Sequence, residues 1–330
     1  MNEPLVSVIV LNYNGKNDLE ECFDALYNLN YKNVEFILVD NNSQDNSVEI
    51  VKTKYKEVKI IKLEKNYGFA EGNNIGAQHA NGKYFALLNM DTKVDKNWIS
   101  ELVKVAEKSK DIGIVGSKNY YYYNRPILSF GFGLCDKYGN TKNIGLNKKD
   151  SIIVNRTTEC FYHCGASLLI SRELYNNIKL FDPVYFAYYE DVDLCWRALI
   201  NGYNVVYAPK SILYHKIGVT DLDDIQKKYW LRRNKLRSIL KNYEKKTILQ
   251  VLPIIFYGWL MLVLSSIFRR ERKYALKFMI IYFKSLIWNI LHLKSLIRER
   301  MQVQERRTKN DKYLLSLIKK FNDNLKENVK

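Results

Sequence analysis

The stretch Tyr84-Phe85-Ala86-Leu87-Leu88-Asn89-Met90-Asp91 decides the fold of this chain. Its first five residues are uncharged and mostly apolar, which is typical of a strand buried on both faces of a parallel sheet. The polar residues that follow, Asn89 and Asp91, then lie at the carboxyl edge of that sheet. Open α/β sheets bind their ligands at this edge. We therefore predict that Asn89 and Asp91 face a ligand.

A second acidic cluster, Glu190-Asp191-Val192-Asp193, opens a predicted helix and follows the aromatic run Phe186-Ala187-Tyr188-Tyr189. Aromatic side chains exclude water from a pocket and shift the pKa values of carboxylates beside them. Together the two acidic clusters indicate group transfer from a phosphorylated donor.

Strand-like and helix-like segments alternate along the first part of the chain. Predicted strands cover residues 6–11, 35–39, 59–63 and 84–88, and predicted helices cover residues 18–29, 47–55 and 72–80. Alternation at this spacing predicts a parallel, doubly wound α/β sheet. From about residue 119 to residue 171, short aromatic segments punctuated by glycine predict an α+β extension that shapes an acceptor cleft.

The positive charge of the chain is concentrated near its C-terminus. The formal net charge is +17, and residues 225–330 hold 26 Lys and Arg against 7 Asp and Glu. Residues 1–224 hold 26 against 28. A basic segment of this kind suits nucleic acid, an anionic membrane or an acidic partner, and its neighbours decide between them.

Those neighbours are apolar. Residues 248–268 carry no charge and are about long enough to span hydrocarbon. Residues 274–300 have the period of a basic amphipathic helix, with Lys277, Lys284 and Arg298 near one line. We predict contact with an anionic membrane surface and no nucleic acid, because nucleic acid would leave the apolar surface uncovered. The alternative is a buried hairpin. Pro253 and the basic residues on both sides of the apolar stretch leave open whether the stretch spans the membrane or lies flat on it.

The N-terminus lacks a basic region before its first strand-like run, so we expect no signal peptide and a cytoplasmic domain. Five Cys, an odd number, favour a reducing compartment over a disulfide framework. The Cys160-x2-His163-Cys164 tract lacks a second ligand pair at zinc spacing and is interpreted as part of the core.

Five motifs in order resemble the family 2 glycosyltransferases with a GT-A fold. They are Val6–Asn14 (VSVIVLNYN), Leu38–Asp45 (LVDNNSQD), Asn66–Asn74 (NYGFAEGNN), Leu88–Asp91 (LNMD) and Glu190–Arg197 (EDVDLCWR). The likeness covers residues 5–240 and is greatest to the rhamnosyltransferase branch of bacterial surface polysaccharide synthesis. It implies three regions: a nucleotide-sugar-binding half (1–118), an acceptor half of the same domain (119–243) and a membrane-associating tail (244–330).

The resemblance assigns donor contacts to several of these residues. Asn12 and Asp40 end the first two strands, where a carboxylate can accept hydrogen bonds from a nucleobase or ribose. Gly68 lets the backbone approach the nucleotide, and Asn74 is the expected side-chain contact of that loop. Turn chemistry is the alternative for Asp40, and an ordinary αβ loop is the alternative for Gly68 and Asn74.

Asp91 stands where the family often shows Asp-x-Asp, but Asn89 replaces the first carboxylate. We expect Asp91 to bind a divalent cation, Mn²⁺ or Mg²⁺, that bridges to the donor diphosphate. The resembling enzymes carry a metal-binding His after a later strand, which implies the same role for His215. A helix cap at Asp91 is the alternative.

Asp191 is the predicted catalytic base, because in-line displacement needs a carboxylate opposite the leaving diphosphate and inverts the anomeric carbon. Asp193 and Arg197 fit a surface i,i+4 pair. Gln226-Lys227-Lys228-Tyr229-Trp230 differs from the Gln-x-x-Arg-Trp of processive synthases, which favours addition of one or a few sugars. Arg233 and Asn234 nearby are expected to contact donor phosphate or a lipid-linked acceptor, with a solvated basic helix face as the alternative.

The prediction is therefore an inverting, metal-dependent hexosyltransferase, peripheral or monotopic on the cytoplasmic face of the cell membrane. Its expected donor is a nucleotide sugar, with dTDP-rhamnose as the first guess, and its acceptor is lipid-linked or a polysaccharide. A non-catalytic, membrane-peripheral scaffold that keeps the fold is the alternative. A dinucleotide-dependent oxidoreductase lacks its Gly-x-Gly-x-x-Gly after the first strand, and a nucleic-acid binder would need a steeply salt-dependent affinity for DNA.

Overall fold

A computed structural model of the protein describes residues 3–217, 224–268 and 272–327. The alternation expected at the N-terminus is confirmed, with helix α3 beginning four residues before its predicted start. These elements are β1 (Val6–Asn12), α1 (Leu19–Tyr27), β2 (Val34–Asp40), α2 (Ser47–Lys54), β3 (Lys59–Lys62), α3 (Gly68–Gln78) and β4 (Tyr84–Asn89). β1 pairs in parallel with β2 and with β4, and β2 pairs in parallel with β3.

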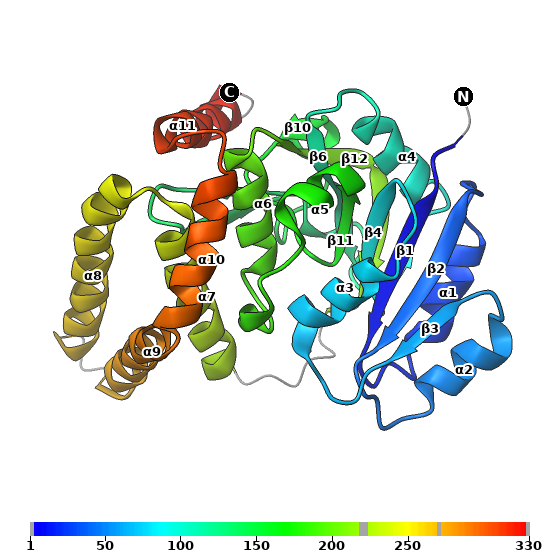
Figure 1. Ribbon diagram of the computed structural model, residues 1–330, viewed down its shortest axis with the longest axis horizontal. Helices are drawn as coiled ribbons and strands as arrows, with labels where there is room; N and C mark the ends of the chain where they lie inside the picture. The colour runs from blue at the N-terminus through cyan, green and yellow to red at the C-terminus, as the bar shows by residue number, and fades with distance from the viewer. Residues whose placement is uncertain (1–2, 218–223, 269–271, 328–330) are drawn as a thin grey trace.

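The complete sheet is mixed, whereas the sequence predicted a parallel one. In the described part of the chain it has ten strands, in the order β10-β12-β6-β11-β4-β1-β2-β3, with β5 beside β12 and β7 beside β6 (Figure 1). β11 (Ser167–Ser171) lies antiparallel to both β4 and β6. The reason is that β11 comes directly after a loop that returns to the carboxyl end of β4, without a crossover helix.

The remaining elements of this domain follow in chain order. They are β5 (Thr92–Val94), α4 (Trp98–Ala106), β6 (Ile112–Tyr121), β7 (Leu128–Phe130), β8 (Phe132–Cys135), β9 (Thr141–Ile144), η1 (Ile152–Asn155), β10 (Thr158–Glu159), α5 (Arg172–Ile178), η2 (Pro183–Tyr185), α6 (Glu190–Ile200) and β12 (Asn204–His215). β8 and β9 form a separate small hairpin, as the glycine-punctuated segment suggested.

Two hydrophobic clusters cover the two faces of the sheet. Along β1, Ile9 packs into one cluster, and Val8 and Val10 pack into the other. This alternation follows from the two-residue period of a strand. Because both faces are covered, ligands can reach the sheet only at its edges and loop ends.

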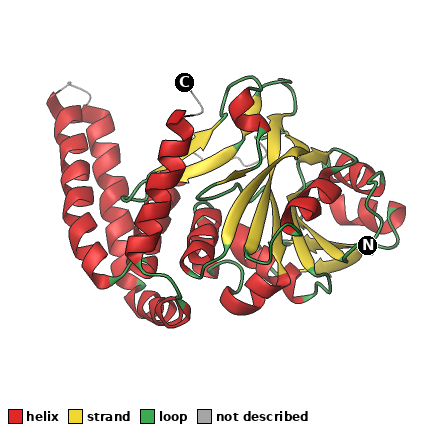
Figure 2. Cartoon of the chain, turned by 90° about the horizontal axis from the view of Figure 1, so that it is seen from above, coloured by secondary structure: helices red, strands yellow, loops and turns green. Residues whose placement is uncertain are grey.

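Within the described residues, five helices follow the sheet: α7 (Asp224–Asn242), α8 (Lys245–Phe268), α9 (Arg272–Leu291), α10 (Leu293–Arg306) and α11 (Asp311–Glu327). α8 and α9 lie side by side at the edge of the molecule, away from the N-terminal half of the sheet (Figures 1 and 2). α11 returns to the domain and buries Leu314, Ile318 and Phe321 in its core. The region after residue 244 therefore has an outer hairpin and an inner pair of helices.

The single amphipathic helix predicted over residues 274–300 is wrong, because the helix bends by 73° between α9 and α10. The bend lies at His292, whose ring stacks on that of Trp288 with centroids 4.0 Å apart. Beyond the bend, Arg300 donates to the carbonyl oxygens of Leu240 and Tyr243, both at 2.6 Å. These bonds attach α10 to α7 and the residues after it.

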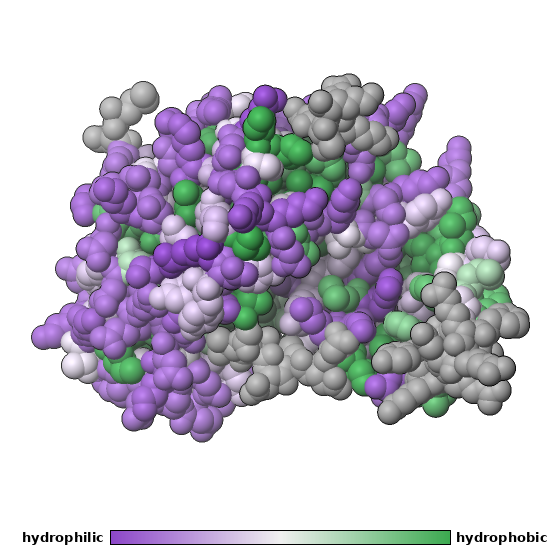
Figure 3. Space-filling view, turned by 180° about the vertical axis from the view of Figure 1, so that it is seen from behind, coloured by the Kyte–Doolittle hydropathy of each residue, from purple (hydrophilic) through white to green (hydrophobic). Residues whose placement is uncertain are grey.

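α8 leaves most of its apolar surface uncovered. Its stretch Lys245–Ser265 is long and apolar enough to cross a membrane, yet only 17% of it is buried. Leu249 is 75% exposed and Leu260 is 54% exposed. Apolar side chains accordingly gather along this edge of the molecule in Figure 3. A soluble core helix would bury this face.

Candidate active site

The carboxyl ends of β1 and β2 bring Asn12 and Asp40 together. The two residues are paired in the parallel register, and Nδ2 of Asn12 donates to Oδ1 of Asp40 at 2.8 Å. The same nitrogen donates to Oγ of Ser47 at 2.9 Å. Asp40 is 4% exposed. Asn12 therefore fixes the direction of the Asp40 carboxylate at the sheet edge where both were predicted to act.

Gly68 occupies a position that only glycine fits. Its φ is +80°, and a Cβ there would lie 2.5 Å from Cδ2 of Phe186. Asn41 holds this loop, because its Nδ2 donates to the Gly68 carbonyl at 3.1 Å and its Oδ1 accepts from the Tyr67 N–H at 2.8 Å. The sequence did not single out Asn41, since an Asn after Asp40 also fits an ordinary turn.

Two predicted contacts, Asn74 and Arg233, have their polar groups engaged within the protein. Oδ1 of Asn74 accepts from the Phe181 N–H at 2.9 Å, and its Nδ2 donates to the Phe181 carbonyl at 3.0 Å. Arg233 is 6% exposed and donates to the Tyr185 carbonyl at 2.7 Å. Both side chains thus hold loops of the site in this structure. The solvated helix face considered as the alternative for Arg233 is wrong, because Arg233 is buried.

Asp91 and His215 meet just beyond the end of β4. Nε2 of His215 lies 3.1 Å from Oδ1 of Asp91, and β12 places His215 opposite Thr92 of β5. The side chains of His215 and Asp91 are 13% and 11% exposed. Asn89 ends β4 and is partly exposed. Two residues 124 positions apart along the chain are thus in contact, and their role as ligands of a cation stays a prediction.

This pair fits a divalent cation as an incomplete set of ligands. A carboxylate with an imidazole suits Mn²⁺ better than Mg²⁺. No group of three or more His, Cys, Asp or Glu that could hold a metal occurs within residues 3–217, 224–268 and 272–327. A cation bound by Asp91 and His215 would therefore take its remaining ligands from a bound donor or from water.

Lys216 brings positive charge beside this pair. Its Nζ lies 2.7 Å from Oδ1 of Asp18 and 3.1 Å from Oε2 of Glu21. Burial opposes the ionisation of Glu21, but hydrogen bonds from Tyr122, Lys93 and Lys216 lower its pKa to about 2. Lys216, Asp18 and Glu21 form a charged cluster that the sequence did not predict, because Lys216 lies far from the other two along the chain.

Asp191 lies in the first turn of α6, where its carboxylate accepts two backbone hydrogen bonds. Oδ2 accepts from the Gly165 N–H at 3.1 Å, and Oδ1 accepts from the Val192 N–H at 2.8 Å. Burial nevertheless raises the pKa of Asp191 to about 6. A carboxylate with that pKa is ionised near neutral pH and is more basic than an ordinary Asp, as a general base requires.

Glu190, the neighbour of Asp191, is 6% exposed, and its Oε2 has no hydrogen-bond partner. Burial, followed by the charge of Asp191, raises the pKa of Glu190 well above its usual value. Two adjacent carboxyl groups thus differ in environment, because Asp191 accepts two backbone hydrogen bonds whereas Oε2 of Glu190 accepts none.

The loop 164–166 connects Asp191 to the end of β4. Ala166 accepts a hydrogen bond from the Asn89 N–H at 3.1 Å, and the adjacent Gly165 donates to Asp191. Burial raises the pKa of the Cys164 thiol to about 12, and the charges of Asp191 and Asp91 both add to that rise.

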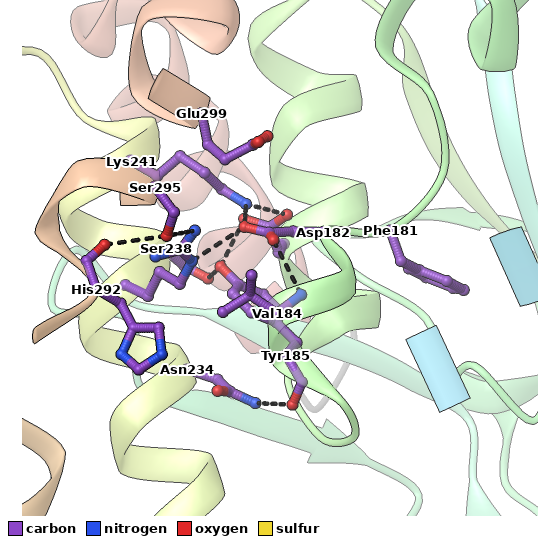
Figure 4. A network of polar contacts seen from close by, with 12 residues as sticks. Phe181, Asp182, Val184, Tyr185, Asn234, Ser238, Lys241, His292, Ser295 and Glu299 are labelled. Atoms are coloured by element: carbon purple, nitrogen blue, oxygen red, sulfur yellow. Dashed lines mark hydrogen bonds and ion pairs between the residues drawn. The ribbon is translucent and has the colours of Figure 1, made fainter. Parts of the chain in front are cut away.

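A buried ionic network joins α6 to α7 (Figure 4). Lys241 lies 2.9 Å from Oδ2 of Asp182 and 3.0 Å from Oδ2 of Asp193, and Arg197 lies 2.8 Å from the same Asp193 oxygen. Arg237 lies 3.0 Å from Asp182. The pair predicted at Asp193 and Arg197 exists, but it is buried. The sequence could not show this, because Asp182, Arg237 and Lys241 come from other segments.

The fold and this arrangement can be compared with known proteins. The family model described as Glycosyl transferase family 2 matches residues 7–178. This chain belongs to glycosyl transferase family 2. The matched segment contains Asn12, Asp40, Gly68 and Asp91 but ends before α6, so the assignment of Asp191 and His215 rests on their geometry.

This family 2 member matches the first of its curated relatives over less than two thirds of their own length. Glycosyltransferase GlyG of Streptococcus pneumoniae is 30% identical over 56% of this chain and 60% of its own length. An uncharacterized glycosyltransferase of Haemophilus influenzae is 36% identical over 35% of this chain and 37% of its own. The low-salt glycan biosynthesis hexosyltransferase Agl10 of Haloferax volcanii is 21% identical over 82% of this chain and 87% of its own.

Solved structures with the same fold include two that hold Mn²⁺. GalNAc-T7 with UDP, GalNAc and Mn²⁺ has a TM-score of 0.60 at 19% identity and covers 74% of this chain and 49% of its own. Mannosyltransferase PcManGT from Pyrobaculum calidifontis with GDP-Man and Mn²⁺ has a TM-score of 0.57 at 15% identity, with 86% and 88% covered. At these identities the likeness shows the GT-A fold alone, which confirms the predicted fold class.

Proposed function

We propose that this protein is an inverting hexosyltransferase that moves a sugar from a nucleotide-diphosphate donor to an acceptor hydroxyl. The observation that carries the proposal is the link between the two acidic sites. Gly165 and Ala166 are adjacent residues, and they bond to Asp191 and to Asn89 respectively. One short loop therefore holds Asp191 and the donor-binding edge of the sheet at a fixed separation. In-line displacement requires such a separation between the base and the donor.

The proposed reaction is a single displacement. The acceptor oxygen forms a bond to the anomeric carbon while the bond from that carbon to the diphosphate breaks, and the leaving group takes the bonding pair. Asp191 accepts the proton of the acceptor hydroxyl. Its carboxylate is already held by the N–H groups of Gly165 and Val192, so little reorganisation is needed. Attack from the face opposite the diphosphate inverts the anomeric centre.

On the donor side, Asp40 would accept hydrogen bonds from the nucleoside, and Asp91 with His215 would hold a divalent cation. When bound, such a cation neutralises charge on the leaving diphosphate. Asn89 supplies an amide where a second carboxylate would stand. Cation affinity should therefore depend on the phosphates of the donor.

The place of action that we propose is the cytoplasmic face of a membrane. The exposed apolar side of α8 and the basic residues on both sides of it support attachment to anionic lipid. An enzyme held there would meet a lipid-linked or polysaccharide acceptor of cell-surface glycan synthesis. We propose dTDP-rhamnose as the first donor to test, on the resemblance to rhamnosyltransferases.

The test is a screen of purified protein with UDP-, dTDP- and GDP-sugars and Mn²⁺, measuring release of nucleoside diphosphate. We expect release from one donor class, with dTDP-rhamnose the first candidate. Binding of a nucleotide without release from any donor, also in the presence of membrane extracts as acceptor, would support the non-catalytic scaffold instead.

A further inference from the structure

The loop that precedes the catalytic carboxylate has an unusual backbone. Three of its residues, Phe186, Tyr188 and Tyr189, have φ values of 63°, 68° and 72°. Residues other than glycine rarely adopt this left-handed region, and bulky aromatic residues are destabilising there. A loop with three such residues among four persists only where its surroundings hold it in place.

This loop touches both halves of the site. Tyr189 directly precedes Glu190 and Asp191 at the start of α6. On the donor side, the Phe186 carbonyl accepts from the Ala70 N–H at 3.1 Å, and the Phe186 ring fills the space beside Gly68. A change in the loop would therefore move the carboxylate relative to the donor-binding loop.

The side-chain amide of Asn234 on α7 donates to three carbonyl oxygens of the loop, and Arg233 donates to one of these, that of Tyr185. Nδ2 of Asn234 donates to the carbonyl oxygens of Tyr185 at 3.2 Å, Ala187 at 3.0 Å and Tyr188 at 2.6 Å. Its Oδ1 accepts from Nε of Arg233 at 2.8 Å, which fixes the orientation of the amide. Asn234 is fully buried and points toward the Tyr185 carbonyl in Figure 4.

α7 itself is anchored independently of these bonds. Arg237 and Lys241, one and two turns further along the helix, pair with Asp182 at 3.0 and 2.9 Å. Nδ2 of Asn289 on α9 donates to the Arg233 carbonyl at 3.1 Å. Loss of the Asn234 side chain should therefore leave α7 in position and release only the loop.

We propose that Asn234 is a positioning residue that keeps the left-handed loop 185–189 closed and thereby aims the Asp191 carboxylate at the acceptor. The inference rests on the proposed function, because it gives Asn234 its importance through Asp191. Asn234 touches no reacting atom. The three hydrogen bonds of its side chain stabilise a backbone conformation that ordinarily needs glycine or turn-forming residues.

The first test compares Asn234→Ala and Asn234→Ser with Asn201→Ala. Asn201 is also a buried Asn that donates to a backbone carbonyl, that of Arg197, but it lies at the other end of α6. We expect kcat to fall at least about tenfold in both Asn234 variants and to stay within about twofold in the control. Nucleotide affinity, measured by calorimetry, should change less than kcat.

Hydrogen exchange followed by mass spectrometry tests the same claim without activity. In Asn234→Ala, amides of residues 185–192 should exchange faster, while those of β1 and β4 stay protected. This readout separates two failures. If the wild-type protein releases no nucleoside diphosphate, the proposed function fails, but faster exchange confined to the loop still supports the holding role of Asn234.

A second-site variant distinguishes loop positioning from a general packing role. Asparagine adopts the left-handed region more readily than tyrosine, so Tyr188→Asn lowers the cost of the closed loop. We expect Asn234→Ala with Tyr188→Asn to regain part of the lost kcat relative to Tyr188→Asn alone. The proposal is overturned if Asn234→Ala keeps the kcat and the loop exchange of the wild type. It is also overturned if exchange rises through the whole domain and Tyr188→Asn restores no activity.

Discussion

The backbone N–H of Gly165 donates to Oδ2 of Asp191 at 3.1 Å. The next residue, Ala166, accepts from the Asn89 N–H at the end of β4. A loop that comes just before an antiparallel strand thus joins the start of α6 to the central parallel strands. The chemistry that we propose depends on this connection, because a base without a fixed distance to the donor gains little rate.

The raised pKa of Asp191 predicts how turnover depends on pH. Its carboxylate must be ionised to accept a proton, and burial raises its pKa to about 6. We expect kcat to fall tenfold per pH unit below that value and to reach a plateau above it. Rates of nucleoside diphosphate release between pH 4.5 and 8, at saturating donor, test this. A plateau that extends down to about pH 4 would assign the base to an ordinary carboxylate.

The cation site predicts unequal effects of its two residues. We expect EDTA to abolish turnover and Mn²⁺ to restore it better than Mg²⁺, because one predicted ligand is an imidazole. Asp91→Ala should cost more activity than His215→Ala, because it removes a charge as well as a ligand.

Calorimetry of Mn²⁺ binding tests this site without turnover. Affinity should rise strongly when nucleoside diphosphate is present, since the two residues form an incomplete set of ligands. Equal affinity with and without the nucleotide, or full turnover in EDTA, would remove both residues from the cation site.

The buried network around Lys241 predicts a large effect on stability. Lys241→Met leaves the carboxylates of Asp182 and Asp193 buried with fewer partners, and we expect a loss of about 3–5 kcal/mol in the free energy of unfolding. Urea denaturation measures it. The control is Lys83→Met, because Lys83 pairs with Glu107 at 2.7 Å but both side chains are about half exposed. That pair should contribute at most about 1 kcal/mol, and equal losses in both variants would contradict the account.

The same network gives stability a dependence on acid pH. Burial opposes the ionisation of Asp182 and Asp193, but Lys241 with Arg237 or Arg197 lowers the pKa of each below its usual value of 3.8. Their contribution is therefore complete above that value and is lost as the pH falls through the lowered pKa values. Urea midpoints should decline below about pH 4 in the wild type and decline less in Lys241→Met.

The outer helices predict lipid binding that can be removed without truncation. Deleting every residue after 244 would also remove α11, whose Leu314 and Phe321 lie in the core, so point variants are the better test. Leu249→Glu with Leu260→Glu should lower binding to anionic liposomes in flotation and leave donor hydrolysis unchanged. Ile152→Glu, at a 71% exposed position on the catalytic domain, is the control. Equal flotation of both proteins would give α8 a different role.

The sequence predicted what local patterns determine and missed what distant segments build together. The apolar run ending at Leu88 predicted a central strand, and it is one. The antiparallel β11 was missed, because strand direction depends on the path of the loop before it. Asn234 was predicted to contact donor phosphate or an acceptor, whereas its buried amide donates to carbonyl oxygens of the loop before α6. Asp182 has no local signal, since its role arises from cations of another element. The bend at His292 was also missed, because a continuous helical period runs through it.

Replacement of Asp191 by Asn tests the central claim most directly. The amide is nearly isosteric, and its oxygen can keep one of the two backbone hydrogen bonds that the carboxylate accepts from Gly165 and Val192, but it cannot accept the acceptor proton. We predict that Asp191→Asn lowers kcat by at least about 10²-fold while donor affinity, measured by calorimetry, stays nearly unchanged. Full turnover in Asp191→Asn would contradict the account, and an equal loss of donor affinity would reassign Asp191 to the donor site.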